Sequence, residues 1–334
     1  MNNYNTHAKI GLKFAFGALL LIASFFTVIL MGAADLTFTD VYSCLFATCV
    51  DPLTQTLVWQ IRLPRVIIGA LCGAGLAVAG AVLQNTTRNP LAEPYLFGVV
   101  SGAGLGATIV SVVFKEASAS YLPIAAFLGA ILAIVIVMAV SVAGKHTRKI
   151  ESLLLAGVAV SFMLSALSQF ILYMGDPFAA NRVMFWLMGS LARVEMPHLY
   201  WIVPVLLIGL AIVVLLHRQL DAILLGDESA ATLGINVTLV RVILLMVCAA
   251  ITATIVAYCG GIGFVGLMIP HIVRRLFAST SLILVCGSAL VGAIFMLWVD
   301  VLARTAVDGQ EIPIGVITSI IGSLFFLTLM HKKV

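Results

Sequence analysis

Long apolar stretches recur along the whole chain, and they constrain its fold more than any other feature. A helix needs about 20 apolar residues to cross a bilayer. Stretches near that length lie at 11–32, 66–84, 96–114, 121–143, 152–173, 199–216, 238–258, 280–299 and 313–330, and a tenth, shorter helix is expected within 264–277. Because a membrane β-barrel would alternate apolar and polar residues, these continuous stretches predict an all-α, polytopic membrane protein with about ten transmembrane helices.

Charged residues are scarce, which excludes a soluble globular fold. Of the 334 residues, 62% are hydrophobic and 10% are charged, and the mean hydropathy is +1.18. Soluble domains carry roughly 25% charged residues. The basic residues are scattered between apolar stretches, without the basic patch and interleaved aromatics that nucleic acid requires. We therefore expect one transmembrane domain over residues 1–334, in contact with lipid and with no nucleic-acid partner.

The distribution of basic residues predicts the orientation. With ten spans and both termini in the cytoplasm, most of the 18 Lys and Arg residues fall on the cytoplasmic side, as the positive-inside rule requires. An odd number of spans would invert half of the loops and remove this bias. The basic residues left outside are Arg62, Arg65, Lys115, Arg182, Arg193 and Arg304.

Two of the cysteines differ from the rest in their expected surroundings. Cys72, Cys248, Cys259 and Cys286 lie in apolar stretches or at the edge of one, as small core residues do. Cys44 and Cys49 lie in the first external loop, which is an oxidising compartment in this topology. A local disulfide between them is an open alternative, because the sequence does not test its geometry. No cysteine or histidine spacing resembles a zinc site.

Motifs for catalysis and nucleotide binding fail on inspection. The glycines of Gly261–Gly266 match the dinucleotide pattern, but no strand–helix unit frames them; close packing or a broken helix explains them better. Gly144-Lys145-His146 lacks the remaining residues of a phosphate-binding loop. His271 has no second metal ligand at a suitable spacing. We expect no catalytic residue, no metal site and no bound cofactor, so the chain is not expected to be an enzyme.

No carboxylate is expected to be buried within the membrane. Glu151 comes nearest, but it lies at a predicted cytoplasmic boundary. Buried carboxylates are the usual mark of proton- or sodium-coupled carriers. If the chain transports a solute, its energy source is therefore expected to lie in another protein.

Glycines are dense in two of the predicted spans. They are Gly69, Gly73, Gly75 and Gly80 in the second span, and Gly98, Gly102, Gly104 and Gly106 in the third. Their four-residue spacing lets helix backbones approach closely. Tight helix packing is the simpler interpretation, and smooth faces for helices that slide are an additional one.

The longest cytoplasmic loop, about 217–237, is expected to carry a projecting helix. The segment Asp221–Asn236 is predicted to be a short amphipathic helix, with Asp227 as a candidate N-cap and Gly234 as a C-terminal stop. Such a helix between two spans suits a cytoplasmic partner.

Six motifs in order resemble FecCD-type permeases, the membrane subunits of ferric-siderophore, haem and cobalamin ABC importers. They are Arg62–Arg65, the glycine-rich span after it, Arg88–Ala92, Gly226–Gly234, Gly263–His271 and Glu311–Thr318. The resemblance runs from about residue 55 to the carboxyl terminus. It implies a multi-pass protein of the bacterial inner membrane with ten helices. The implied partners are a second permease subunit, identical or closely related, two cytoplasmic ATPase subunits that bind ATP and Mg, and a periplasmic binding protein.

The resemblance also implies roles for particular residues. The ATPase-coupling helix comprises Gly226, Asp227, Glu228, Ser229, Ala230, Ala231, Thr232, Leu233 and Gly234. Binding-protein docking maps onto Arg62, Arg65 and Arg304, with snorkelling of helix-end arginines as the alternative. The translocation pathway is expected along Gly157, Ser161, Met163, Ser165, Ser168, Thr318 and Ser319, for which core packing is almost as good an explanation.

The resemblance favours a permease that imports a ferric siderophore, powered by a separate ATPase. Haem and cobalamin remain alternative cargoes, since specificity in such systems lies largely with the binding protein. Two other classes of membrane protein have less support from the sequence. A proton-coupled carrier would need intramembrane carboxylates, and a membrane-embedded enzyme would need clustered polar residues at one depth.

Overall fold

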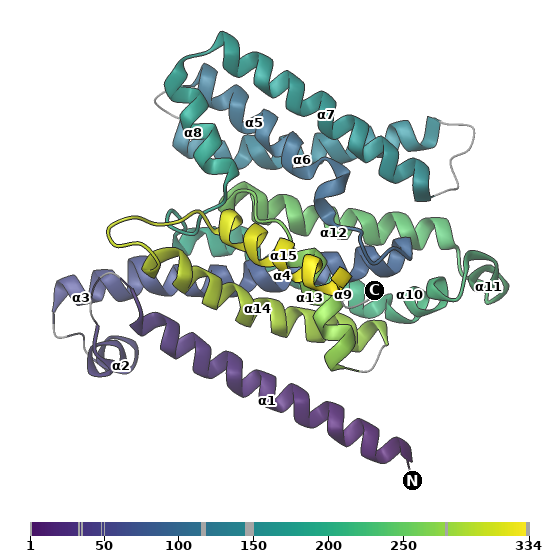
Figure 1. Ribbon diagram of the computed structural model, residues 1–334, viewed down its shortest axis with the longest axis horizontal. Coiled ribbons are helices and arrows are strands. Elements are labelled where there is room, and N and C mark those ends of the chain that lie inside the picture. The colour runs from purple at the N-terminus through teal and green to yellow at the C-terminus, as the bar shows by residue number, and fades with distance from the viewer. Residues whose placement is uncertain are drawn as a thin grey trace.

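The protein is a bundle of helices that run mostly along one direction (Figure 1). The computed structural model describes residues 2–32, 34, 36–47, 49, 51–114, 118–143, 150–277 and 280–331. Within these ranges the chain forms helices and no strand. They are α1 (Asn2–Leu30), α2 (Phe38–Phe46), α3 (Pro52–Thr56), η1 (Leu57–Arg62), α4 (Leu63–Thr87), η2 (Pro94–Phe97), α5 (Val99–Val113), α6 (Ser118–Ala143), α7 (Ile150–Met174), α8 (Pro177–Leu187), η3 (Met196–His198), α9 (Leu199–Leu215), α10 (His217–Leu224), α11 (Asp227–Thr232), α12 (Val237–Cys259), α13 (Val265–Leu276), α14 (Ser281–Thr305) and α15 (Ile314–His331).

Every predicted span is found as a helix. Eight helices in the described part of the chain are long and apolar enough to cross a membrane. The shorter α5 and α13 occupy the places of the third predicted span and of the short helix expected within 264–277. The second span was predicted too short, because α3, η1 and α4 continue one another as a 36-residue helix from Pro52 to Thr87.

The helices form two groups beside a central α4. Helices α5, α6, α7 and α8 lie together on one side, while α1 lies on the opposite side along α14 (Figure 1). One end of the bundle carries α2 and α3, and we call it the α3 end. The other carries α10 and α11, and we call it the α11 end.

Close approach of glycines sets the spacing of the central helices. A Cβ atom on Gly73 of α4 would collide with the backbone of Gly292 in α14, and Gly80 lies equally close to Gly266 in α13. In the other helix group, Gly102 of α5 meets Gly129 of α6. Inside a membrane, van der Waals contact rather than hydrophobic burial drives helix association, so small residues at crossings stabilise the bundle. The predicted tight packing is confirmed.

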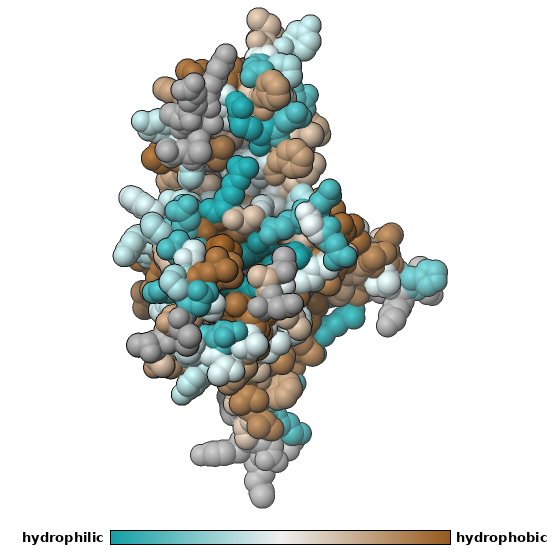
Figure 2. Space-filling model, turned by 90° about the vertical axis from the view of Figure 1, so that its left-hand side faces the viewer, coloured by the Kyte–Doolittle hydropathy of each residue, from teal (hydrophilic) through white to brown (hydrophobic). Residues whose placement is uncertain are grey.

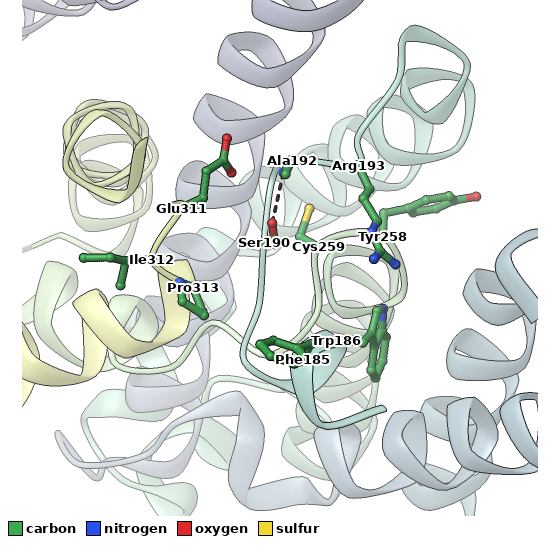
Figure 3. Close-up of a pocket in the computed structure, with 10 residues that line it drawn as sticks. All are labelled: Phe185, Trp186, Ser190, Ala192, Arg193, Tyr258, Cys259, Glu311, Ile312 and Pro313. Carbon is green, nitrogen blue, oxygen red and sulfur yellow. Dashed lines mark hydrogen bonds between the residues drawn. The ribbon is translucent and has the colours of Figure 1, made fainter. Parts of the chain in front are cut away.

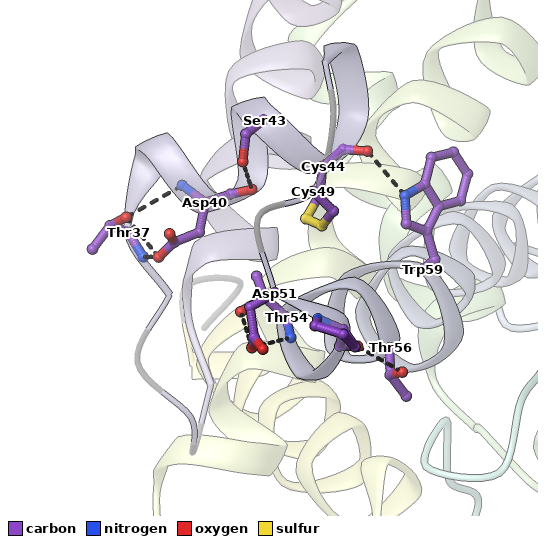
Figure 4. Close-up of a disulfide and its surroundings, with 10 residues drawn as sticks. Thr37, Asp40, Ser43, Cys44, Cys49, Asp51, Thr54, Thr56 and Trp59 are labelled. Atoms are coloured by element: carbon purple, nitrogen blue, oxygen red, sulfur yellow. Dashed lines mark hydrogen bonds between the residues drawn. A yellow bond between two sulfur atoms is a disulfide. The ribbon is translucent and has the colours of Figure 1, made fainter.

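The segment between α1 and α4 is held by a disulfide and by side-chain caps (Figure 4). Cys44 and Cys49 are bonded to each other, which settles the alternative left open by the sequence. The Trp59 indole N–H donates to the Cys44 carbonyl at 3.0 Å. Thr37 and Asp40 form a capping box at the start of α2, and Asp51 caps α3 through the Thr54 amide at 3.1 Å. These contacts fold the α3 end into a defined structure.

The Gly73–Gly292 crossing gives a first prediction. Replacing Gly73 with Leu should force α4 and α14 apart, at a cost of roughly 1–3 kcal/mol or more for overpacking. We expect a lower melting temperature of the purified protein in detergent. Gly11→Leu in α1 is the matched control, because nothing lies within 4 Å of the added Cβ. Equal melting of the two variants would contradict this account of the crossing.

Candidate functional site

Three helices have one end at a common point inside the bundle. Helix α8 ends at Leu187, α13 begins at Val265 after a non-helical stretch, and α15 begins at Ile314. The intervening segments are 188–190, 260–264 and 312–313, and they cross one another. We call this place the crossing. Non-helical backbone at membrane depth is tolerated only where the protein supplies hydrogen-bond partners or where a cavity admits water.

Backbone groups of the crossing satisfy one another. The Ser190 amide donates to the Cys259 carbonyl at 2.8 Å. The Ile314 amide donates to Gly189 and the Gly315 amide to Met188, both at 3.0 Å. These three bonds tie the ends of α8, α12 and α15 together.

Glycine is required where these segments touch. A Cβ on Gly260 would collide with the Trp186 carbonyl, and one on Gly189 or Gly315 would meet the Gly261 carbonyl. Gly189 and Gly260 also have φ angles of +74° and +72°, in the left-handed region that glycine enters at no steric cost. The interpretation of Gly261–Gly266 as a broken helix is confirmed.

Two side chains from the segment before α5, one of them in η2, complete the crossing. The Tyr95 hydroxyl accepts from the Ile262 amide at 2.6 Å. The Glu93 carboxylate accepts from the Phe264 amide at 2.8 Å, next to the N-terminus of α13, where the helix dipole favours negative charge. Phe264 has φ +68°, which costs a non-glycine residue about 1–2 kcal/mol. Its ring packs against Gly322 of α15.

The crossing separates two cavities. The larger, of about 560 Å³, lies on its α11 side; the smaller, of about 260 Å³, lies on its α3 side (Figure 3). The larger is lined by Glu93, Tyr95, Val100, Leu187, Met188, Gly261, Gly263, Phe264, Gly315, Val316, Ser319 and Ile320. The smaller is lined by Phe185, Trp186, Ser190, Ala192, Arg193, Tyr258, Cys259, Glu311, Ile312 and Pro313. The crossing thus stands as a septum between the two cavities.

Most of the predicted pathway residues do not line either cavity. In α7, Gly157 packs against the Leu96 backbone, and Ser161, Ser165 and Ser168 bond to neighbouring groups of α7 and α5. Met163 lies on the opposite, exposed face, and Thr318 is fully buried. Of the seven, Ser319 alone borders the larger cavity. The pathway role of the others stays a prediction.

Sequence patterns do not predict the contacts of Glu93 and Tyr95 with the crossing. Their available signal was the pair of prolines at 90 and 94, which stops α4 and turns the chain back toward the bundle. The partners of these two side chains lie more than 160 residues further along the chain, so local patterns do not reveal them.

The three predicted docking arginines form a buried cluster at the α3 end. Arg65 donates to Asp300 at 2.8 Å and to Glu311 at 2.7 Å. Arg304 pairs with Asp300 at 3.2 Å and donates to the carbonyls of Met31 and Val28. We name Arg62, Arg65, Asp300, Arg304 and Glu311 the arginine cluster.

Arg62 has a different set of partners within the cluster. Its guanidinium donates to the carbonyls of Ile29, Leu30 and Ala34. Together with Arg304 it satisfies carbonyls at the C-terminus of α1, which lack partners within that helix. The side chains of Arg62 and Arg65 are buried, so they are neither open docking residues nor snorkelling ones in this conformation. A cavity of about 310 Å³ reaches all three arginines, and the docking role stays a prediction.

Asp300 shows that the expected absence of membrane-buried carboxylates is wrong. It lies in α14 with 1% of its surface exposed, so a spanning helix does contain a buried carboxylate. Its two arginine partners balance its charge, which is the usual condition for burying an ion. The side chain of Glu151 and the Lys145–Lys149 segment lie outside the described residues.

The predicted coupling helix is two helices. Helix α10 ends at Leu224 and α11 begins at Asp227, with Gly226 at φ +121° between them. Asp227 is not the N-cap: Gly226 holds that position. The Asp227 carboxylate instead binds Arg88 at 2.8 Å and Arg241 at 3.0 Å.

The C-terminal stop at Gly234 is confirmed. Gly234 has φ +79°, and the amides of Gly234 and Ile235 donate to the carbonyls of Ala231 and Ala230, the pattern of a Schellman motif. Leu225 and Leu233 are 73% and 66% exposed. Residues 225–234 project at the α11 end with exposed apolar side chains, and we call them the knob.

Comparison with known proteins places these features in a family. The model of the FecCD transport family matches residues 19–332. The Fe(3+)-citrate import system permease protein YfmE of Bacillus subtilis is 40% identical over 84% of each chain. The cobalamin import system permease protein BtuC of Halobacterium salinarum is 38% identical over 85% of this chain and 76% of its own.

Solved structures agree with this placement. A chain assigned to the metal-chelate type of ABC transporter, in an inward-facing conformation, superposes with a TM-score of 0.85 and 32% identity. The superposition covers 96% of this chain and 99% of that one. PsaBC from Streptococcus pneumoniae, in complex with Fab, has a TM-score of 0.59 at 16% identity, which shows a shared fold alone.

The arginine cluster gives a second prediction. Arg65→Ala should lower stability by about 3 kcal/mol, because truncating one partner of a buried ion pair strands the other charge. The melting temperature in detergent measures the loss. Adding Asp300→Asn to Arg65→Ala should recover part of it, while Arg182→Ala on the exposed face of α8 should have little effect. Wild-type melting of Arg65→Ala would show that the cluster contributes no stability.

Proposed function

The chain belongs to the FecCD transport family of ABC importer permeases, and from this premise we propose that it imports a ferric chelate of the siderophore class. Its place is the bacterial inner membrane. The observation that carries the proposal is the crossing, which separates a cavity on the α11 side from one on the α3 side. ATP is hydrolysed by partner subunits.

Transport requires the crossing to open. Each of its backbone hydrogen bonds contributes only about 0.5–1.5 kcal/mol net, so a relative movement of α8, α12 and α15 can break all three. In the proposed orientation the α3 end faces the periplasm and the α11 end the cytoplasm. The larger cavity on the α11 side then corresponds to an inward-facing state, as in the structurally similar metal-chelate type transporter.

A second permease subunit is proposed to complete the pathway. The exposed side of α15 carries Ile320, Leu324 and Leu327, each more than half exposed, and Ser319 and Ile320 border the larger cavity. One chain thus lines only part of the path. An identical or closely related subunit facing this side would enclose it.

The knob at the α11 end is the proposed contact for the ATPase subunits. Asp227 ties α11 to Arg88 beyond α4 and to Arg241 in α12, so a push on α11 reaches two spanning helices. The exposed Leu225 and Leu233 suit a groove on the partner. The residues assigned to coupling by resemblance, Gly226–Gly234, form this knob.

The periplasmic binding protein is proposed to dock at the α3 end. Figure 2 views this end and shows many hydrophilic side chains across it, interspersed with apolar ones. An acidic side chain entering the 310 Å³ cavity would reach Arg62, Arg65 and Arg304. Docking there would compete with the contacts within the arginine cluster.

Uptake measurements test the cargo. Radiolabelled ferric siderophores, ferric citrate, haem and cobalamin are supplied to cells with and without the gene, before and after ATP depletion. We expect the deletion to abolish ATP-dependent uptake of one iron chelate. Loss of haem or cobalamin uptake instead would reassign the cargo, and unchanged ATP-dependent uptake of every compound would refute the proposal.

The knob gives a further prediction. Ala231 is exposed on α11, so Ala231→Arg should block the ATPase groove without disturbing the contacts of Asp227. We expect at least a tenfold loss of uptake, equivalent to about 1.4 kcal/mol, with the permease still present in the membrane. Ala231→Ser is the matched control and should transport normally. Full uptake by Ala231→Arg would exclude this surface from coupling.

A further inference from the structure

The smaller cavity, on the α3 side of the crossing, combines aromatic side chains with one cation. We call it the vestibule. Phe185, Trp186 and Tyr258 contribute rings, and Arg193 contributes a guanidinium. In the view of Figure 3 the Arg193 guanidinium lies between the side chains of Tyr258 and Trp186, and Glu311 lies across the cavity.

Arg193 is an uncompensated charge. It is exposed, and within the described residues it makes no hydrogen bond, ion pair or ring contact. Arg182, the neighbouring external arginine in α8, differs because its guanidinium donates to the Ser111 carbonyl at 3.1 Å. No stabilising contact among the described residues therefore accounts for an arginine in the vestibule.

The vestibule's carboxylate does not cancel this charge. Glu311 accepts from Arg65 at 2.7 Å, and Arg65 also shares Asp300 with Arg304. The cluster thus sets the three arginines Arg62, Arg65 and Arg304 against two carboxylates. The vestibule and the cavity beside it carry a net positive charge.

A guanidinium among aromatic rings is suited to a planar anionic group. It donates two parallel hydrogen bonds to a carboxylate, and it is weakly hydrated, so little is lost when water leaves. Aromatic faces add contact area for flat ligand groups. A cationic chelate would be repelled here, and a neutral one would gain nothing from the charge.

We infer that the vestibule is a binding subsite for an anionic ferric chelate, one with carboxylate or catecholate oxygens, and that Arg193 is its specificity-determining residue. This inference rests on the proposed import of a ferric chelate. It narrows the cargo to the anionic members of that class. Cargo released at the α3 end meets Arg193 before it reaches the crossing.

The test compares chelates of different charge in cells that express the whole transporter. The probes are ferric citrate and a ferric tris-catecholate as anions, a neutral ferric hydroxamate, a cationic ferrioxamine, and cobalamin. Each is supplied below saturation to wild type, Arg193→Gln, Arg193→Lys and Arg182→Gln. Arg182→Gln is the matched control, because it removes the same charge from an exposed residue outside the vestibule.

We expect wild type to import an anionic chelate, and Arg193→Gln to lower its uptake about tenfold by slowing association. Arg193→Lys should retain most of the uptake, and Arg182→Gln all of it. A second readout is quenching of Trp186 fluorescence by the anionic chelate in the purified transporter. Trp186→Phe corrects for absorption by the iron, and Arg193→Gln should weaken the quenching.

The outcomes separate the two proposals. If wild type imports none of the iron chelates in an ATP-dependent way, the proposed function fails, and this inference fails with it. If wild type imports only a neutral or cationic chelate, or if Arg193→Gln transports an anionic one normally, the importer stands and the vestibule assignment is overturned.

Discussion

Every backbone amide and carbonyl inside a bilayer needs a partner within the protein, and the centre of this molecule depends on how that demand is met. Unbroken helices satisfy it by themselves. Here three helices end inside the bundle, and their free groups bond to one another and to Tyr95 and Glu93. Because the partners come from separate chain segments, the crossing exists only once the whole bundle has assembled. The two cavities follow from it.

The need for hydrogen-bond partners also explains the arginine cluster at the α3 end. The last carbonyls of α1 lack partners in their own helix, and Arg62 and Arg304 supply donors from η1 and α14. Asp300 and Glu311 then balance charges that would be costly to bury alone. Glu311 also lines the vestibule, so the segment that anchors the cluster leads directly into α15 and the crossing. Capping of α1, charge balance and the septum are therefore parts of one connected structure.

The sequence predicts those structural features that depend on a pattern within one helix. Continuous apolar stretches locate the spans, and the spacing of Gly73 and Gly102 indicates close helix contact, because both signals are repeated within one element. The partners of Arg65 and Glu93 lie in distant elements, so no local pattern shows that these side chains point inward. Ser165 and Ser168 of α7 suit a pathway by their chemistry, but their place on the helix turns them toward Ser101 and Thr108 of α5. Asp227 resembles an N-cap in sequence, but Arg88 and Arg241 hold its carboxylate.

The glycines of the crossing also limit how such a protein can diverge. Gly189, Gly260 and Gly315 leave no room for any side chain, so a larger residue at any of them would force the segments of the crossing apart. Mutations that change the shape or charge of the two cavities must therefore fall on the side chains that line them. The backbone of the crossing and the walls of the cavities can thus vary independently, and one scaffold can present different cavity linings around the same glycines.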